Sequence, residues 1–171
     1  MKYLPRLIAL MGIFLFSSLL SGDHSGKWSF IEDESNPDYM TQISQTSITS
    51  ITNESTFEEV FPNLTFYCTK NNPDPVLQIN WKRFISSFNK TEIGFQVDKE
   101  KMTWIKFNVD KTGNITRQDS LSQSQLLINR LLGKTVLKVE VEPYSEPAVS
   151  VEFNLQDFVV YIEKLRNSCM I

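Results

Sequence analysis

Residues 136–153 read VLKVEVEPYSEPAVSVEF and carry the clearest structural signal in the chain. Apolar and polar side chains alternate strictly on both sides of residues 144–147, which are rich in turn formers. Alternation with a period of two places one set of side chains on each face of a strand. The segment therefore predicts a β-hairpin with one buried face, and it points to an antiparallel β protein.

The same pattern predicts two more hairpins upstream. The runs 64–69 (LTFYCT) and 76–81 (VLQINW) flank the turn-rich segment 70–75, which we expect to form a wide loop. The runs 92–98 (EIGFQVD) and 102–109 (MTWIKFNV) flank a short polar turn. Three hairpins thus account for most of the middle and end of the chain.

The chain before these hairpins is predicted to add strands and one loop. Residues 27–32 (KWSFIE) alternate as a half-buried strand does. Residues 39–53 are rich in Thr, Ser and Ile and predict one strand or two paired strands. Residues 54–62 are polar and end in proline, which predicts a loop whose Phe57 and Phe61 pack back onto the sheet.

Two helices complete the expected fold. Ser120 is placed to cap a helix in which leucines recur at helical spacing and which Gly133 ends. Residues 155–168 carry a second apolar stripe, with Asn154 as the expected cap. About eight short strands and two short helices, the second C-terminal, predict a mainly β protein, either an antiparallel β-sandwich or a rolled sheet.

The first 22 residues have the features of a secretory signal peptide. Lys2 and Arg6 precede an apolar run, and the small residues Ser21 and Gly22 end it. The alternative is an uncleaved membrane anchor, but about fourteen apolar residues fall short of the roughly twenty that a spanning helix needs. We therefore expect residues 23–171 to form a single β-rich domain, located in the periplasm or secreted.

Cys68 and Cys169 are the only cysteines of the chain. A chain exported to an oxidising compartment usually joins such a pair, and the alternative is two buried free thiols. We expect the bridge, which would close nearly the whole domain.

The sequence shows no group of residues that carries out catalysis or holds a cofactor or metal. His24 is the only histidine and lies beside the expected cleavage site, so a metal site or a catalytic triad lacks its usual groups. The net charge of −3, without a basic run, argues against nucleic-acid binding. An acid–base pair of carboxylates is the remaining enzymatic alternative, but the candidates lie in or beside predicted turns, where capping roles are expected: Asp98, Glu100, Asp110 and Asp119.

Two further patterns leave alternatives open. Trp28, Trp81 and Trp104 fall on predicted strands, where core positions are expected and a ligand groove is the alternative. Four Asn-x-Ser/Thr triplets would accept glycans in a eukaryotic secretory route and have no such meaning in a bacterium: Asn53, Asn63, Asn89 and Asn114.

Several short motifs occur together in this chain, each of them once. They are GKW at 26–28, LTFYCTKNN at 64–72, VLQINW at 76–81, FQVD at 95–98 followed by Trp104, VEVEPY at 139–144, and NLQDF with IEKLRNSC at 154–169. In this combination the chain resembles the small periplasmic accessory proteins of the VasI/TagO kind that are associated with bacterial type VI secretion. The likeness covers about residues 27–169 and departs from the family at Tyr67, Gln96 and Met170, where relatives commonly carry Arg, Arg and Trp.

The resemblance implies an exported, non-enzymatic protein that assists assembly of a secretion machine and that binds another envelope protein or a cell-wall component. It would meet the membrane only through export. Only Cys68 and Cys169 carry over from the family as functional positions, beside Asp98 and Trp104 as motif residues. The alternatives are a periplasmic inhibitor or immunity-like protein, with 70–75 as its contact loop, and an envelope hydrolase that uses two carboxylates.

Overall fold

The computed structural model describes residues 26–33 and 40–170, and these form a mainly β fold. The predicted signal peptide, with His24, lies outside the described residues. The elements are β1 (Ser29–Asp33), β2 (Met40–Thr46), β3 (Ile51–Asn53), β4 (Glu58–Val60), β5 (Asn63–Thr69), β6 (Asn72–Asn80), β7 (Lys90–Val97), β8 (Thr103–Val109), β9 (Ile115–Gln118), α1 (Leu121–Leu131), β10 (Val136–Val141), β11 (Val149–Asn154) and α2 (Phe158–Cys169). Among them, neither helix is long and apolar enough to cross a membrane.

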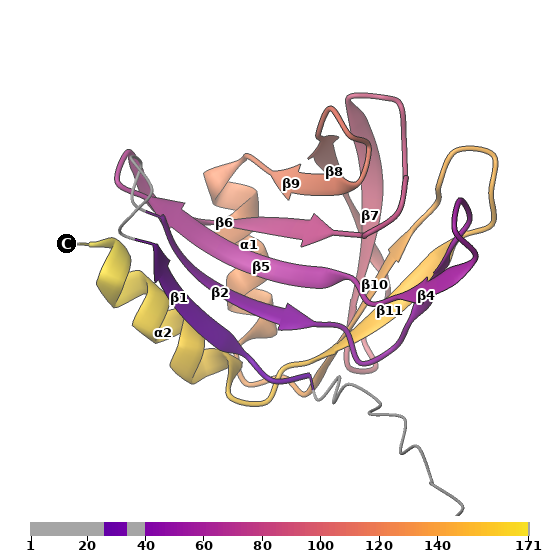
Figure 1. Cartoon of the computed structure of the whole chain (residues 1–171). Helices are drawn as coiled ribbons and strands as arrows, with labels where there is room; N and C mark the ends of the chain where they lie inside the picture. Colours follow the sequence, from indigo (N-terminus) through magenta and orange to yellow (C-terminus); the bar gives the residue numbers. More distant parts are fainter. Residues whose placement is uncertain (1–25, 34–39, 171) are drawn as a thin grey trace, which may run out of the picture.

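Nine strands form one antiparallel sheet in the order β1-β2-β5-β6-β9-β8-β7-β10-β11. The β8–β9 pairing covers only Asn108↔Arg117 and Val109↔Thr116, so the sheet divides there. Figure 1 shows β1, β2, β5, β6 and β9 running across the molecule, while β7, β10 and β11 cross them steeply. The sheet is therefore rolled into two crossing layers, and the predicted fold class, with its C-terminal second helix, is confirmed.

The core lies on the inner face of the rolled sheet, against both helices, and follows from the alternation in the sequence. Ile43 and Phe66 face each other in register on β2 and β5, and both are fully buried. On the other layer, Val139 of β10 lies between Phe95 and Val151 and is equally buried. Burial of one such side chain contributes about 1.5–3 kcal/mol, so the period-two pattern determines which face of each strand turns inward.

The two helices cover the first layer. α1 packs against β6 and β9, and its start is capped as predicted, because the Ser120 hydroxyl accepts a hydrogen bond from the backbone N–H of Gln123. α2 packs against β2, β5 and β6, and the ring of Phe158 lies 5.1 Å from that of Trp28 and 5.2 Å from that of Phe66. Its last residue, Cys169, is bonded to β5.

All three predicted hairpins are present, with one correction to their turns. β5 pairs with β6, β7 with β8, and β10 with β11, each antiparallel. The wide loop expected at 70–75 is wrong, because β6 already begins at Asn72 and its backbone N–H donates to the hydroxyl of Thr69. The density of Asn and Pro in this segment indicated a longer turn than the chain makes.

The region before β5 differs more from the prediction. Residues 39–53 contain two strands, β2 and β3, but these do not pair with each other. The predicted loop 54–62 contains β4, which pairs with β3 in a separate two-stranded sheet. Phe57 does not pack onto the sheet but sits at the turn of this small hairpin, with 79% of its surface exposed.

Two other boundaries were also predicted wrongly. The strand β9 lies between the third predicted strand pair and the first helix, in residues 115–118, for which no strand was predicted. The second helix begins later than expected, since Asn154 belongs to β11 and the N-cap residue is Asp157, whose backbone is left-handed (φ 62°) and whose side chain makes no capping hydrogen bond.

Candidate functional site

The predicted site residues serve mainly to hold the fold together. Cys68 and Cys169 form a disulfide with a Cα–Cα distance of 6.0 Å, and it joins residues 101 positions apart. Trp28 and Trp81 are core residues, as expected; the indole N–H of Trp81 donates to the hydroxyl of Thr116 at 3.0 Å. Trp28, Trp81 and Cys68 are therefore buried, and Cys169 is linked to the interior by the disulfide bond.

Trp104 is the exception, because 40% of its surface is exposed. It faces Gly94 across the β7–β8 pair, and a Cβ atom added to that glycine would lie 3.2 Å from the indole ring. The indole thus covers a strand position that has no side chain. The expectation of a core position is wrong for Trp104, whose ring lies on the outer face, where Gly94 leaves room for it.

The carboxylates considered as an acid–base pair have local partners. Asp98 accepts three hydrogen bonds from Thr135 and Val136, and Glu100 pairs with Arg130 and Lys134. The Thr135 hydroxyl and the Val136 N–H lower the pKa of Asp98, while Lys134 and Arg130 lower that of Glu100. A general acid needs a raised pKa, so both shifts run in the opposite direction.

The two other carboxylates also bind neighbouring residues. Burial raises the pKa of Asp110, but hydrogen bonds from the Thr112 hydroxyl and from backbone N–H groups of its turn outweigh this and leave the pKa lowered. Asp119 pairs with Arg117 and accepts a hydrogen bond from Asn108. Within the described residues, no group of three His, Cys, Asp or Glu side chains could hold a metal ion.

A buried arginine connects three loops at one end of the molecule. Arg83, only 3% exposed, lies in the loop between β6 and β7. Its guanidinium donates to the carbonyl of Thr52 on β3 at 2.6 Å, pairs with Glu146 in the loop between β10 and β11, and lies 3.7 Å from Glu54 in the turn between β3 and β4. Only the arginine of this pair is buried, since Glu146 is partly exposed, and loss of its partners would leave a buried charge, so these contacts hold the three loops together.

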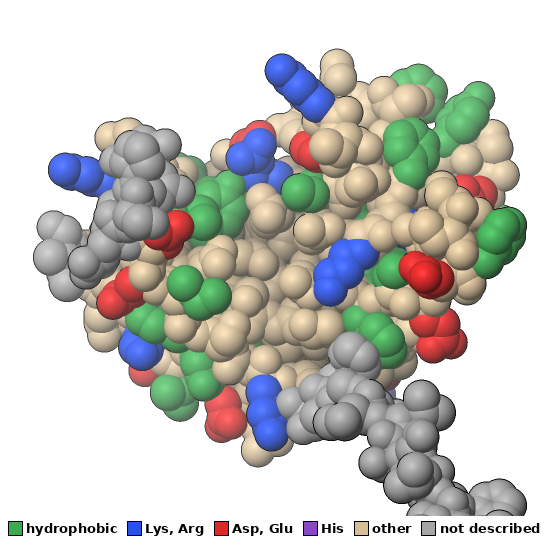
Figure 2. Space-filling model, in the orientation of Figure 1, with side chains coloured by type: hydrophobic (Ala, Val, Ile, Leu, Met, Phe, Trp, Pro, Cys, Tyr) green, Lys and Arg blue, Asp and Glu red, His purple; other side chains and the backbone are tan. Residues whose placement is uncertain are grey.

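This end carries large exposed aromatic side chains, which we call the aromatic end: Phe57, Phe84, Phe88 and Tyr144. The rings of Phe88 and Tyr144 meet edge to face with centroids 5.7 Å apart, and the Tyr144 backbone N–H donates to Ile85. Figure 2 shows hydrophobic side chains gathered on the same side, over the loops at the right of Figure 1. Exposed aromatic groups gathered on one surface are typical of interaction sites.

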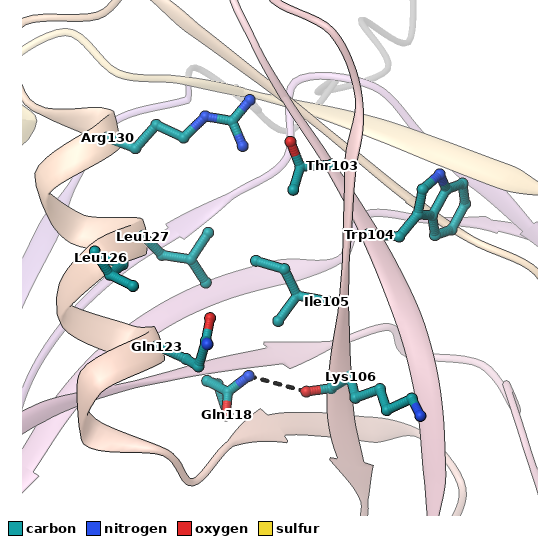
Figure 3. Close-up of a pocket in the computed structure, with 9 residues that line it drawn as sticks. All are labelled: Thr103, Trp104, Ile105, Lys106, Gln118, Gln123, Leu126, Leu127 and Arg130. Atoms are coloured by element: carbon teal, nitrogen blue, oxygen red, sulfur yellow. Dashed lines mark hydrogen bonds between the residues drawn. The ribbon is translucent and has the colours of Figure 1, made fainter.

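A second surface feature, the β8 groove, lies between α1 and β8 and has a volume of about 520 Å³. Its lining is Thr103, Trp104, Ile105, Lys106, Gln118, Gln123, Leu126, Leu127 and Arg130. In Figure 3, Ile105 and Leu127 point toward each other across the groove, whereas the ring of Trp104 points away from it. Leu126 is 63% exposed at its rim.

Sequence reasoning identified neither surface. The aromatic end joins three loops that are distant in the chain, and its Phe57 was expected to be packed. Regular apolar spacing in α1 did indicate one buried face, but Leu126 lies outside that face. The exposed aromatic residues between strand-forming runs were the one available signal for the aromatic end.

Comparison with known proteins adds no relative. No family model matches the chain, and no significant match was found among curated proteins or solved structures. The resemblance to the VasI/TagO proteins of type VI secretion therefore stays a prediction from the motifs.

Proposed function

We propose that this chain is an exported, non-enzymatic binding protein of the bacterial envelope, which assists type VI secretion assembly by docking on another envelope component. The observation that carries the proposal is the aromatic end, held together by Arg83. The disulfide between Cys68 and Cys169 supports export, since such bridges persist in oxidising compartments.

A protein partner suits this surface best. Tyr and Phe supply large contact areas at small entropic cost, and rings that are fixed before binding lose little further freedom. Phe88 and Tyr144 already contact each other, and Phe84 packs beside Gly113 of a neighbouring turn. The surface is therefore organised for binding in the free protein.

The inhibitor alternative loses its named contact loop, because residues 72–75 belong to β6. A hydrolase would need a carboxyl with a raised pKa, while the shifts of Asp98, Glu100 and Asp110 are downward. Neither alternative is favoured by a specific contact of the described residues.

The test is capture of partners from the native envelope fraction, with intact mass of the captured protein measured under non-reducing conditions. We expect a chain that starts near Asp23 and lacks two hydrogens, and a secretion-machine protein bound to it. The double variant Phe88→Ala/Tyr144→Ala should retain less than about a tenth of that partner, since each buried aromatic anchor contributes about 2 kcal/mol.

Val160→Ala is the matched control, because Val160 is similarly exposed but lies on α2. It should capture the partner as the native protein does. An uncleaved chain, alkylatable thiols, or equal capture by the double variant would contradict the proposal.

A further inference from the structure

The edge of β8 that faces the groove has backbone groups without a neighbouring strand. The N–H of Asp110, just after β8, donates to Ile115 of β9, so the even-numbered residues here direct their backbone groups to that side. The β9 pairing ends at Asn108, and within the described residues no strand pairs with this edge at Lys106 or Trp104. These two residues therefore direct backbone N–H and C=O groups into the groove.

Gln118 already satisfies one of these groups in the way a strand would. Its side-chain amide donates to the carbonyl of Lys106 at 2.9 Å, and its own oxygen accepts from the N–H of Ser120 at 3.0 Å. Figure 3 shows this bond at one end of the groove. The N–H and C=O of Trp104 and the N–H of Lys106 are left facing the opening.

We propose that the β8 groove binds an extended, acidic segment of a partner protein, which adds to β8 as an antiparallel strand. Strand addition is the binding mode that satisfies an open edge. The two charged residues of the lining are both cationic, and no acidic residue lines it. Figure 3 shows that the Lys106 side chain extends on the same side of β8 as the Trp104 ring, so it faces a residue of an added strand placed opposite it on that side. Glu100 pairs with Arg130 and offsets part of the positive charge of the groove. The same carboxylate also pairs with Lys134, so it offsets the Arg130 charge only in part.

The register of β8 specifies the order of side chains in the bound segment. A residue opposite Trp104 exchanges two backbone hydrogen bonds with it. The preceding residue lies opposite Ile105, on the face that points to Leu127, and should be apolar. The residue before that lies opposite Lys106 and should be Asp or Glu, so the segment reads acidic, apolar, then any strand-forming residue.

The proposal is independent of the aromatic end, and synthetic peptides test it on the disulfide-bonded protein. The probe is a fluorescent nonapeptide with a central Glu-Leu-Thr, measured by anisotropy. A Lys-Leu-Thr peptide should bind about fivefold more weakly because it replaces attraction with repulsion. Methylation of the threonine backbone nitrogen should weaken binding about tenfold, because it removes the hydrogen bond to Trp104.

Two variants and two controls locate the binding. Leu126→Asp should weaken binding of the Glu-Leu-Thr peptide about tenfold, and Lys106→Glu should reverse the preference between the two peptides. Leu121→Asp, also exposed on α1 but outside the groove, should bind normally. The aromatic-end variant Phe88→Ala/Tyr144→Ala should also bind normally, so that failure of this proposal and failure of the proposed function are distinguishable.

Amide hydrogen exchange gives a readout that belongs to the backbone alone. In the free protein the Trp104 N–H should exchange faster than the Ile105 N–H, which faces β7, and the peptide should protect it. Absence of binding, equal binding of the methylated peptide, or unchanged exchange at Trp104 would overturn the proposal. Concentration-dependent dimers abolished by Leu126→Asp would also overturn it, by showing that a second copy occupies the edge.

Discussion

At the scale of single residues, the carboxylate of Asp98 connects two strands of the sheet. Its backbone is left-handed (φ 49°), and its Oδ1 accepts from the Thr135 hydroxyl at 2.6 Å and from the backbone N–H groups of Thr135 and Val136. These bonds tie the end of β7 to the start of β10. The residue singled out from the sequence is thus a connector between two strands.

The charge of Asp98 should make stability depend on acid pH. Because its pKa in the folded protein lies below the ordinary 3.8, its contribution is complete above that value and is lost as the pH falls through the lowered pKa. Asp98→Asn should therefore lower the urea midpoint at pH 7, and the difference from the native protein should shrink below about pH 4. Asp74→Asn controls for the loss of one surface charge; a pH-independent difference for Asp98→Asn would contradict the assignment.

Trp104 marks the limit of sequence reasoning about single residues. The alternation of β8 was readable, and it placed this tryptophan on one face of a strand. Which face is solvent-exposed depends on the partner strand, and the position of Gly94 opposite Trp104 is a matter of register between strands. Composition alone carries no such information.

At the scale of elements, the turn between β8 and β9 supports the aromatic end. The carbonyl of Gly113 accepts from the N–H of Ile85 at 2.8 Å, and its backbone is left-handed (φ 73°). A Cβ atom at this position would lie 2.5 Å from the Phe84 ring and 2.6 Å from the carbonyl oxygen of Ser86. The turn and the β6–β7 loop therefore fit together only with glycine at 113.

Gly113→Ala should lower the free energy of unfolding by about 2–3 kcal/mol, combining the left-handed strain with the backbone clash. Gly133→Ala is the matched control, since its φ is 69° and no atom lies within 4 Å of the added Cβ, so only about 1 kcal/mol is expected. Urea unfolding measures both. Equal losses would show that the clash at 113 is relieved without cost.

The elements that could be predicted are those defined by local pattern. The three hairpins and the cap at Ser120 depend on residues close in sequence, and they were found. β4 has only three residues and pairs with a strand equally short, so neither has enough alternation to be recognised. β9 owes its strand geometry to pairing with β6, whose partner residues lie 35–41 positions upstream, and a local pattern does not reveal such a pairing.

At the scale of the whole molecule, the disulfide joins β5 to the end of α2, 101 residues further along the chain. In the chain-entropy model, a closed loop of about 100 residues contributes roughly 4–5 kcal/mol. The double variant Cys68→Ala/Cys169→Ala should therefore unfold at a lower urea concentration, because its free energy of unfolding should be lower by about 4 kcal/mol. Reductant should lower the midpoint of the native protein and leave the variant unchanged; a native midpoint insensitive to reductant would contradict this role.

The same bridge also sets an order of events. In the folded protein its two sulfur atoms meet where α2 lies on β5, and the rings of Phe158 and Phe66 pack together in the same place. We therefore expect oxidation to be a late step in refolding, after these aromatic contacts have formed. The rate at which the thiols of a refolding chain become protected from alkylation should therefore report how fast α2 docks on the sheet.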